Sequence, residues 1–319
     1  MPHLLELDNL MTYFFTRRGV VKAVRGIDLH IDRGETVALV GESGCGKSMT
    51  ALSIMRLVPK PGRIVQGTIS FNGRNLDELS EQEMLRVRGN QIGMIFQEPM
   101  TSLNPVFQVG EQIGEVLRLH RGIQRSDAIA AACDLLQQVG ISSPQKRVND
   151  YPHQLSGGMR QRVMIAMALA CNPDLLIADE PTTALDVTIQ AQILELLAEL
   201  KAERDMATLL ITHDLGLVAQ YADRVAIMYA GLIMECAPVD VLFSNPQHPY
   251  TRGLLGCVPQ LGKRRDRLQT IDTRMIKNEP YGFVESFLDR CPAPFAPRNK
   301  ALPTLKEASP GHLVRRWQE

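Results

Sequence analysis

Apolar and polar residues alternate over the first 35 positions of the chain, on both sides of a polar stretch at 16–19. A period of two is typical of strands that bury one face, and a short polar stretch that ends in glycine is typical of a turn. We therefore expect a small antiparallel β element here. Its apolar positions are Leu5, Leu7, Leu10, Val24, Ile27, Leu29 and Ile31.

Three later segments are almost continuously apolar and predict buried strands at 36–40, 175–178 and 208–212. A helix-like segment at 49–57 follows the first, and apolar positions between 189 and 200 recur at helical spacing between the other two. Buried strands that alternate with helices predict an α/β fold, in which helices cover a parallel sheet.

Two regions interrupt this alternation. From about 110 to 170 the apolar residues follow helical spacing without a clear strand, which predicts a helical insert. Beyond residue 240 prolines cluster, and their density predicts a loop-rich appendage.

Composition narrows the class of protein. The 319 residues include 35 Lys and Arg against 35 Asp and Glu, and 45% are hydrophobic, as in globular rather than disordered chains. Zero net charge argues against a nucleic-acid partner. The longest apolar run, 163–171, is shorter than the roughly 18 residues of a membrane helix, and no signal peptide is recognisable. We expect a cytosolic protein that reaches a membrane only through a partner.

The six cysteines form no CxxC pair. This spacing predicts buried thiols in a reducing compartment, with neither disulfides nor zinc.

A glycine-rich loop follows the strand predicted at 36–40. Residues 41–48 are GESGCGKS and fit G-x-x-x-x-G-K-[ST], in which backbone N–H groups surround phosphates, Lys47 reaches the outer phosphates and Ser48 ligates Mg²⁺. A dinucleotide-binding loop is the nearest alternative, but Met49 stands where its third glycine would be. We therefore expect ATP and Mg²⁺ at Gly41, Glu42, Ser43, Gly44, Cys45, Gly46, Lys47, Ser48 and Met49.

Acidic residues and a histidine follow the other two predicted strands. Because open α/β sheets bind ligands at the carboxyl ends of strands, we expect Asp179 to hold Mg²⁺ and Glu180 to polarise an attacking water. His213 follows 208–212, where it would contact the γ-phosphate or orient Glu180. These residue types predict phosphoryl transfer.

The sequence Leu155-Ser156-Gly157-Gly158-Met159 resembles the LSGGQ-type signature of ABC ATPases, with Met159 in place of the usual glutamine. Ser156, Gly157 and Gly158 would present backbone donors at the start of a helix beginning near Met159, and a positive helix end suits a γ-phosphate. The resemblance implies a P-loop NTPase fold, here an ABC nucleotide-binding domain with an N-terminal antiparallel β element, a helical signature subdomain and a loop-rich C-terminal extension.

Further segments resemble other motifs of that family. Gln97 is similar to the Q-loop glutamine, which senses Mg²⁺ and the attacking water, and Asp186 ends a segment similar to the D-loop. The resemblance implies that Glu180, His213 and Gln97 are catalytic. It also implies that Ser48, Gln97 and Asp179 hold the metal and that Gln97, Asp179, Ser156, Gly157, Gly158 and Asp186 contact the nucleotide.

An aromatic residue stacks on adenine in this family. Phe14 lies near the corresponding place, and its neighbours Tyr13 and Phe15 remain alternatives.

Three stretches resemble the ATP-binding subunits of bacterial dipeptide and oligopeptide importers: GESG at 41–44, EPMTSLNP at 98–105 and NPQHPYT at 245–251. The resemblance implies an ABC ATPase domain at 1–240, with its helical subdomain at about 105–170, and a transporter-type extension at 241–319. Members often build an iron–sulfur cluster in this extension. Cys291 matches one ligand, but Asn299 and Arg316 stand near the places of others, so we expect no cluster.

The implied function is ATP hydrolysis that powers peptide import at the cytoplasmic face of the inner membrane. The implied partners are a second, different ATP-binding subunit, two membrane permeases and, indirectly, a periplasmic binding protein. Nickel, glutathione, opines or another small solute are alternative cargoes. A non-transport ABC ATPase of DNA repair or ribosomes, and a nucleotide-binding module without turnover, are weaker alternatives, because the chain lacks a long coiled-coil insert and a second cassette and keeps Asp179, Glu180 and His213.

Overall fold

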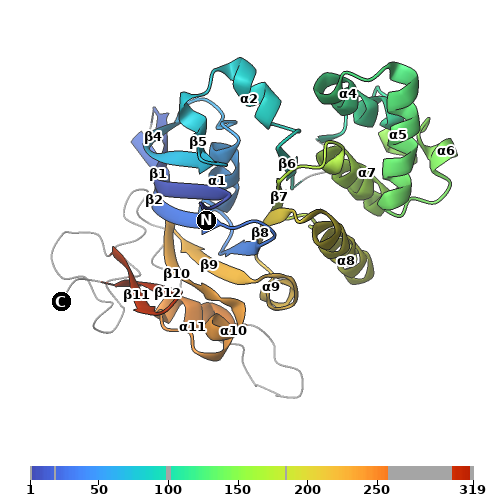
Figure 1. The fold of residues 1–319 in the computed structure, drawn as a ribbon. Coiled ribbons are helices and arrows are strands. Elements are labelled where there is room, and N and C mark those ends of the chain that lie inside the picture. The colour runs from blue at the N-terminus through green and yellow to red at the C-terminus, as the bar shows by residue number, and fades with distance from the viewer. Residues whose placement is uncertain (1, 18, 98–101, 184, 258–303, 317–319) are drawn as a thin grey trace. The chain divides into compact units, whose positions relative to one another are not determined.

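The computed structural model describes residues 2–17, 19–97, 102–183, 185–257 and 304–316 (Figure 1). These residues divide into two compact units. Unit 1 comprises residues up to 4, 31–35 and 72–211, and unit 2 comprises 5–30, 36–71 and the residues from 212 onward.

Unit 1 is built on three parallel strands in the order β6-β7-β8, which are β6 (Ile92–Ile95), β7 (Leu175–Asp179) and β8 (Ala207–Thr212). Every residue of these strands is buried. Burial on both faces explains why β7 and β8 are continuously apolar rather than alternating. Their prediction from the sequence is confirmed.

Helices make up most of the rest of unit 1. The α-helices α4 (Val109–Arg121), α5 (Arg125–Gln138) and α7 (Gly157–Leu169) pack against one another (Figure 1). Their residues Ile113, Leu136 and Val163 are fully buried. The helical insert predicted for about 110–170 is therefore present. The other elements described in unit 1 are β5 (Arg74–Asn75), η1 (Leu76–Glu78), α2 (Glu81–Val87), α6 (Pro144–Arg147), η2 (Pro152–Gln154) and α8 (Val187–Arg204).

Unit 2 contains the predicted N-terminal β element. The strands β1 (Leu5–Thr16) and β2 (Gly19–Ile31) are neighbours in one sheet, and β1 pairs antiparallel with β4 (Gly62–Phe71). Buried and exposed residues alternate at the start of β1, because only one face of this sheet meets the core.

A second sheet of unit 2 carries the glycine-rich loop. Its strands lie in the order β11-β12-β10-β9-β3, and β3 is parallel to β9 whereas the other neighbours are antiparallel. The bounds are β3 (Thr36–Val40), β9 (Arg224–Tyr229), β10 (Leu232–Pro238), β11 (Thr304–Ser309) and β12 (His312–Arg316).

The helices of unit 2 include α1 (Lys47–Ile54) and α9 (Leu215–Tyr221). The sequence predicted a helix at 49–57, but α1 begins two residues earlier and ends three residues earlier. It begins at Lys47 because Gly46, in the left-handed region, closes the preceding loop, and it cannot extend through Arg56, whose φ is +51°.

The chain beyond residue 240 forms regular elements where it is described. They are α10 (Val239–Ser244), α11 (Pro249–Gly256) and the β11–β12 hairpin, while 258–303 lies outside the described residues. Pro249 starts α11, a position where the missing N–H of proline costs nothing. The proline-rich sequence predicted loops, but at Pro249 the proline begins a helix.

Five cysteines fall among the described residues, and none of the five forms a disulfide. Cys45, Cys171 and Cys236 are buried, as expected. Cys133 and Cys257 are partly exposed, which corrects the expectation for these two; in α5 it is the neighbouring Ala132 that enters the core. Cys291 lies outside the described residues.

Candidate functional site

The glycine-rich loop connects β3 to α1 in unit 2, and two of its glycines are required by close backbone contacts. A Cβ atom at Gly41 would lie 2.1 Å from the carbonyl oxygen of Met228, and one at Gly46 would lie 2.4 Å from that of Ala23. Gly46 has a φ of +111°, which only glycine adopts readily. Nothing lies within 4 Å of the Cβ position at Gly44, so the loop is open there.

Lys47 is buried at the start of α1, with an exposed fraction of 5%. Its Nζ donates to the carbonyl oxygens of Gly41 at 2.8 Å and Glu42 at 3.0 Å. These bonds stabilise a buried ammonium group inside the loop. Burial raises the pKa of the Glu42 carboxyl, which the Lys47 charge opposes, and burial likewise raises the pKa of the Cys45 thiol.

The other loop residues range from exposed to half-buried: Ser43 and Gly44 are exposed, and Ser48 and Met49 are half-buried. The hydroxyl of Ser48 lies in the first turn of α1, directly after Lys47.

The three candidate aromatics of β1 differ in their surroundings. The Phe14 ring lies over Gly62, where a Cβ atom would come within 2.7 Å of Cε1. Thr12, on the same strand face as Phe14, hydrogen bonds Ser53 of α1 at 2.7 Å. Tyr13 and Phe15 are on the opposite face, where their rings meet Lys22 and Arg63. The face that carries Phe14 is thus the one that meets the helix following the loop.

In unit 1 the acidic pair lies at the carboxyl end of β7. Asp179 is its last residue and is 5% exposed, and Glu180 follows with a φ of +46°. A non-glycine residue in this region is uncommon and is a feature of many functional sites. The Glu180 N–H donates to the carbonyl oxygen of Ile211 in β8 at 2.9 Å, which holds the turn against the neighbouring strand.

The Glu180 carboxylate accepts two side-chain hydrogen bonds on Oε2. Gln97 Nε2 donates at 3.1 Å, and Thr183 Oγ1 donates at 2.8 Å. Gln97 is 83 positions away in the sequence, so tertiary structure brings the two together. Our sequence reasoning missed Thr183, although a hydroxyl residue three positions after an acid is a local signal for such a bond.

The LSGGM segment forms the start of α7. Ser156 caps this helix, and its Oγ accepts from the N–H of Met159 at 3.3 Å. The helix begins at Gly157, two residues before the predicted start near Met159, because the serine cap determines where the first turn begins. Gly157 is exposed and Gly158 is half-buried.

The D-loop-like segment lies beside the same helix start. Asp186 caps α8 by accepting from the N–H of Ile189 at 2.9 Å, and a Cβ atom at Gly158 would lie 3.0 Å from Cγ2 of Ile189. Gln161 of α7 donates to the carbonyl oxygen of Pro181, a contact that the sequence did not suggest. The helix starts of α7 and α8 and the residues after Glu180 therefore form one neighbourhood.

His213 follows β8 and is exposed, next to Asp214, whose side chain caps α9. It belongs to unit 2, as do Phe14 and the glycine-rich loop. Gln97, Asp179, Glu180, Asp186 and the LSGGM segment belong to unit 1. Ala184 of the D-loop-like segment and Glu98 to Thr101 lie outside the described residues, as does Asn299, while Arg316 ends β12.

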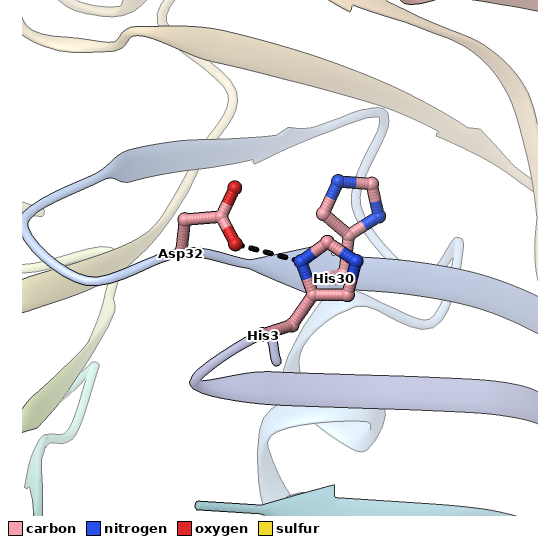
Figure 2. Close-up of side chains that lie close together, drawn as sticks. All are labelled: His3, His30 and Asp32. Carbon is pink, nitrogen blue, oxygen red and sulfur yellow. Dashed lines mark hydrogen bonds and ion pairs between the residues drawn. The ribbon is translucent and has the colours of Figure 1, made fainter. Parts of the chain in front are cut away.

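Another group of possible metal ligands is drawn in Figure 2. His3 Nδ1 and Asp32 Oδ1 hydrogen bond at 2.6 Å, and this bond is the dashed line in the figure. His30 Nε2 contacts the guanidinium of Arg224. A guanidinium beside the imidazole opposes a second cation, so we assign these side chains a structural role.

None of the described helices combines the length with the apolar character that crossing a bilayer requires.

Comparisons with known proteins show the family of the chain. The family model "ABC transporter" matches residues 24–183, and "Oligopeptide/dipeptide transporter, C-terminal region" matches residues 234–296. Among solved structures, a post-hydrolysis dimer of an ATP-binding cassette bound to ADP and Pi is 28% identical with a TM-score of 0.67, covering 74% of this chain and 98% of that one. The structure of cbiO1 from Clostridium perfringens, part of the ABC transporter complex cbiONQ, is 26% identical with a TM-score of 0.65, covering 77% of this chain and 92% of that one.

Curated relatives match over nearly the whole chain. "Probable peptide ABC transporter ATP-binding protein y4tR" of Sinorhizobium fredii is 50% identical over 99% of this chain and 95% of its own length. "Oligopeptide transport ATP-binding protein AppD" and "Dipeptide transport ATP-binding protein DppD", both of Bacillus subtilis, are 51% and 49% identical over 99% of this chain and 96% and 95% of their own lengths. The predicted fold class and resemblance are confirmed, and the chain belongs to the ABC transporter family.

Proposed function

We propose that this protein binds and hydrolyses ATP to power the import of dipeptides and oligopeptides through a bacterial membrane transporter. The pair of hydrogen bonds that fixes the Glu180 carboxylate, from Gln97 and Thr183, carries the hydrolytic part of the proposal. Peptide as cargo is supported by full-length relatives named for peptide transport and by the match of residues 234–296 to the transporter C-terminal region.

The nucleotide is held by residues of unit 2. The backbone of Gly41 to Met49 surrounds the phosphates, with the open side of Gly44 facing the ligand, and Phe14 stacks on the base. Lys47 exchanges its bonds to the loop carbonyls for bonds to phosphate oxygens. Ser48, Gln97 and Asp179 offer the hard oxygen ligands that suit Mg²⁺, which neutralises phosphate charge when bound.

Glu180 orients and polarises the water that attacks the γ-phosphate. Gln97 and Thr183 hold the carboxylate through Oε2, and the carboxylate accepts a proton from that water. His213 contacts the γ-phosphate and stabilises the charge that develops there. Ser156, Gly157 and Gly158 bind the ATP of a second subunit, and Asp186 lies at that junction. One loop and one signature per chain require such a pairing, which we infer to be with a different chain.

Two permeases are the membrane partners, and they hold the protein at the cytoplasmic face of the inner membrane. Val106 and Phe107 follow the stretch at 98–105 and are 70% and 54% exposed. Neighbouring exposed apolar side chains are typical of an interaction site. We assign them to the permease contact. Residues 1–240 form the ATPase domain in this proposal, and 241–319 form the extension.

Uptake of labelled dipeptides and tripeptides tests the proposal in cells that lack this gene and any redundant importer. We expect the wild-type gene to restore uptake and the Glu180→Gln gene to leave it absent at equal protein level. Unchanged uptake in the deletion strain would move the cargo to nickel, glutathione, opines or another solute. Absence of ATP binding by the purified wild-type protein would reject the ATPase role itself.

We also propose that the extension holds no iron–sulfur cluster, since residues 241–319 contain only two cysteines, Cys257 and Cys291, and a Cys₄ cluster needs four thiolate ligands. Protein purified without oxygen should contain no stoichiometric iron. Iron at cluster stoichiometry, together with broad absorbance near 400 nm, would reject this proposal.

A further inference from the structure

A buried tyrosine of the 245–251 segment lies beside the phosphate-binding loop. Tyr250 is fully buried in α11, in a core cluster that also contains Val40, the residue before Gly41. Its ring contacts that of Tyr229 in β9 in a tilted arrangement, with 4.6 Å between the ring centroids and 50° between the ring planes. This segment of the extension thus reaches the core beneath the loop.

The loop itself rests on the same part of the sheet. Gly41 lies against the carbonyl oxygen of Met228, the neighbour of Tyr229. The N–H of Gly231, which follows β9, donates to the carbonyl oxygen of Cys45 at 2.8 Å. Residues on both sides of Tyr229 therefore contact the loop, one at Gly41 and the other at Cys45.

The electrostatic surroundings of Tyr250 also include the loop. Burial raises the pKa of its phenol, and the charges of Glu42 and Cys45 raise it further, whereas the Glu42 backbone opposes that rise. The phenol is therefore protonated at physiological pH.

A buried carboxylate fixes the segment that carries Tyr250. Glu235 of β10 is fully buried and accepts from the N–H groups of Gln247 at 2.7 Å and His248 at 2.9 Å. The same carboxylate bonds Nε2 of His312 in β12 at 2.7 Å. His248 Nδ1 then accepts from the N–H of Tyr250 at 3.1 Å and caps α11.

We propose that Tyr250 is a positioning residue for the nucleotide-binding loop, and that Glu235 and the C-terminal β11–β12 hairpin hold it in place. The contacts run from His312 through Glu235 and the 247–248 backbone to Tyr250, and from there to Tyr229 and the loop. The extension therefore contributes to ATP binding from within the same subunit. This inference rests on the proposed ATP-binding function.

The test measures affinity for a fluorescent ATP analogue with Mg²⁺, using the full-length protein. Tyr250→Leu keeps an apolar side chain but removes the ring that contacts Tyr229, and we expect binding about three- to tenfold weaker, the usual effect of losing one aromatic pair. Leu242→Ala is the matched control, because Leu242 is fully buried in the same cluster and belongs to α10. It should lower the melting temperature without changing the affinity.

A second pair of variants tests the contact of His312 with Glu235, which is the contact farthest from the loop. His312→Ala removes the donor to Glu235 and should weaken nucleotide binding, whereas His312→Gln retains an N–H donor and should restore part of the affinity. Hydrogen exchange of the 41–48 amides should be faster in His312→Ala than in the wild type and in Leu242→Ala.

The outcomes separate the two proposals. If the wild type fails to bind the analogue, the proposed function is wrong. If the wild type binds, and both Tyr250→Leu and His312→Ala bind as tightly with unchanged exchange at 41–48, the segment only stabilises the fold and the inference is overturned.

Discussion

At the scale of single residues, Glu180 combines three constraints. It occupies left-handed backbone, its N–H bonds the neighbouring strand, and its carboxylate accepts from Gln97 and Thr183. Such a carboxylate has a fixed direction before any substrate arrives, and preorganisation of this kind lowers the cost of reaching the transition state.

Glu180→Gln should lower ATP hydrolysis by about 10²- to 10⁴-fold while ATP binding persists, because the amide cannot accept a proton from water. Phosphate release by the assembled transporter measures the rate, and a fluorescent analogue measures the binding. Glu199→Gln, at an exposed position of α8, is the matched control and should hydrolyse normally. Hydrolysis by Glu180→Gln at the wild-type rate would rule out the general-base role.

The loop glycines allow a second prediction at this scale. Gly44→Ala should cost about 1 kcal/mol of the free energy of unfolding, because its φ is +81° but its Cβ side is open. Gly46→Ala should cost distinctly more and abolish ATP binding, since its Cβ atom would also meet the Ala23 carbonyl at 2.4 Å. Urea unfolding and nucleotide titration compare the two, and equal behaviour would contradict the assigned contact.

At the scale of secondary structure elements, capping side chains determine the boundaries that hydrophobic periodicity leaves open. The apolar pattern located the helix after the LSGGM segment, but Ser156 places its start at Gly157. Gly46 similarly moves the start of α1 to Lys47 and so brings the lysine into the first turn. Periodicity reports which face of a helix is buried, whereas its ends depend on individual hydrogen bonds.

Two serine residues that cap helices allow an effect on stability to be distinguished from an effect on ATP hydrolysis. Ser156 caps α7 and Ser80 caps α2, each by accepting a backbone N–H. Alanine at either position should cost about 1 kcal/mol in the free energy of unfolding. Only Ser156→Ala should also impair hydrolysis by the assembled transporter, because Ser156 belongs to the proposed γ-phosphate contact. Equal activities of the two variants would remove Ser156 from that role.

At the scale of the whole molecule, stability depends on the buried polar side chains around Glu235, which include His248 and His312. Burial, followed by the charge of Arg315, lowers the pKa of His248 to about 3. The imidazole therefore stays neutral in the folded protein and can accept the cap bond from Tyr250. In the unfolded chain its pKa returns to about 6.5, so between these values the unfolded state binds more protons.

The stability from His248 is fully present above about pH 6.5 and is lost as the pH falls toward 3. When the pH falls from 7 to 5, protonation of this residue in the unfolded chain should lower the free energy of unfolding by about 2 kcal/mol. His248→Asn keeps a capping acceptor but does not titrate, so its unfolding free energy should fall less over the same interval. Parallel pH dependence of the two proteins in urea unfolding would contradict the assignment.

The sequence alone determined the chemistry of the motifs and the kind of most elements. The loop at 41–48, the acids after β7 and the LSGGM segment are local patterns, and the periods of two and 3.6 residues are local as well, so both are visible without a structure. Tertiary structure decided which residues meet across long separations. The bond of Gln97 to Glu180 joins positions 83 residues apart, and the contact of His312 with Glu235 joins positions 77 residues apart. Tyr250 shares a core cluster with Val40, 210 positions earlier in the chain (250 − 40 = 210). No local pattern encodes such pairings. They arise because burying apolar faces forces distant polar groups together, and each buried polar group must then find a partner.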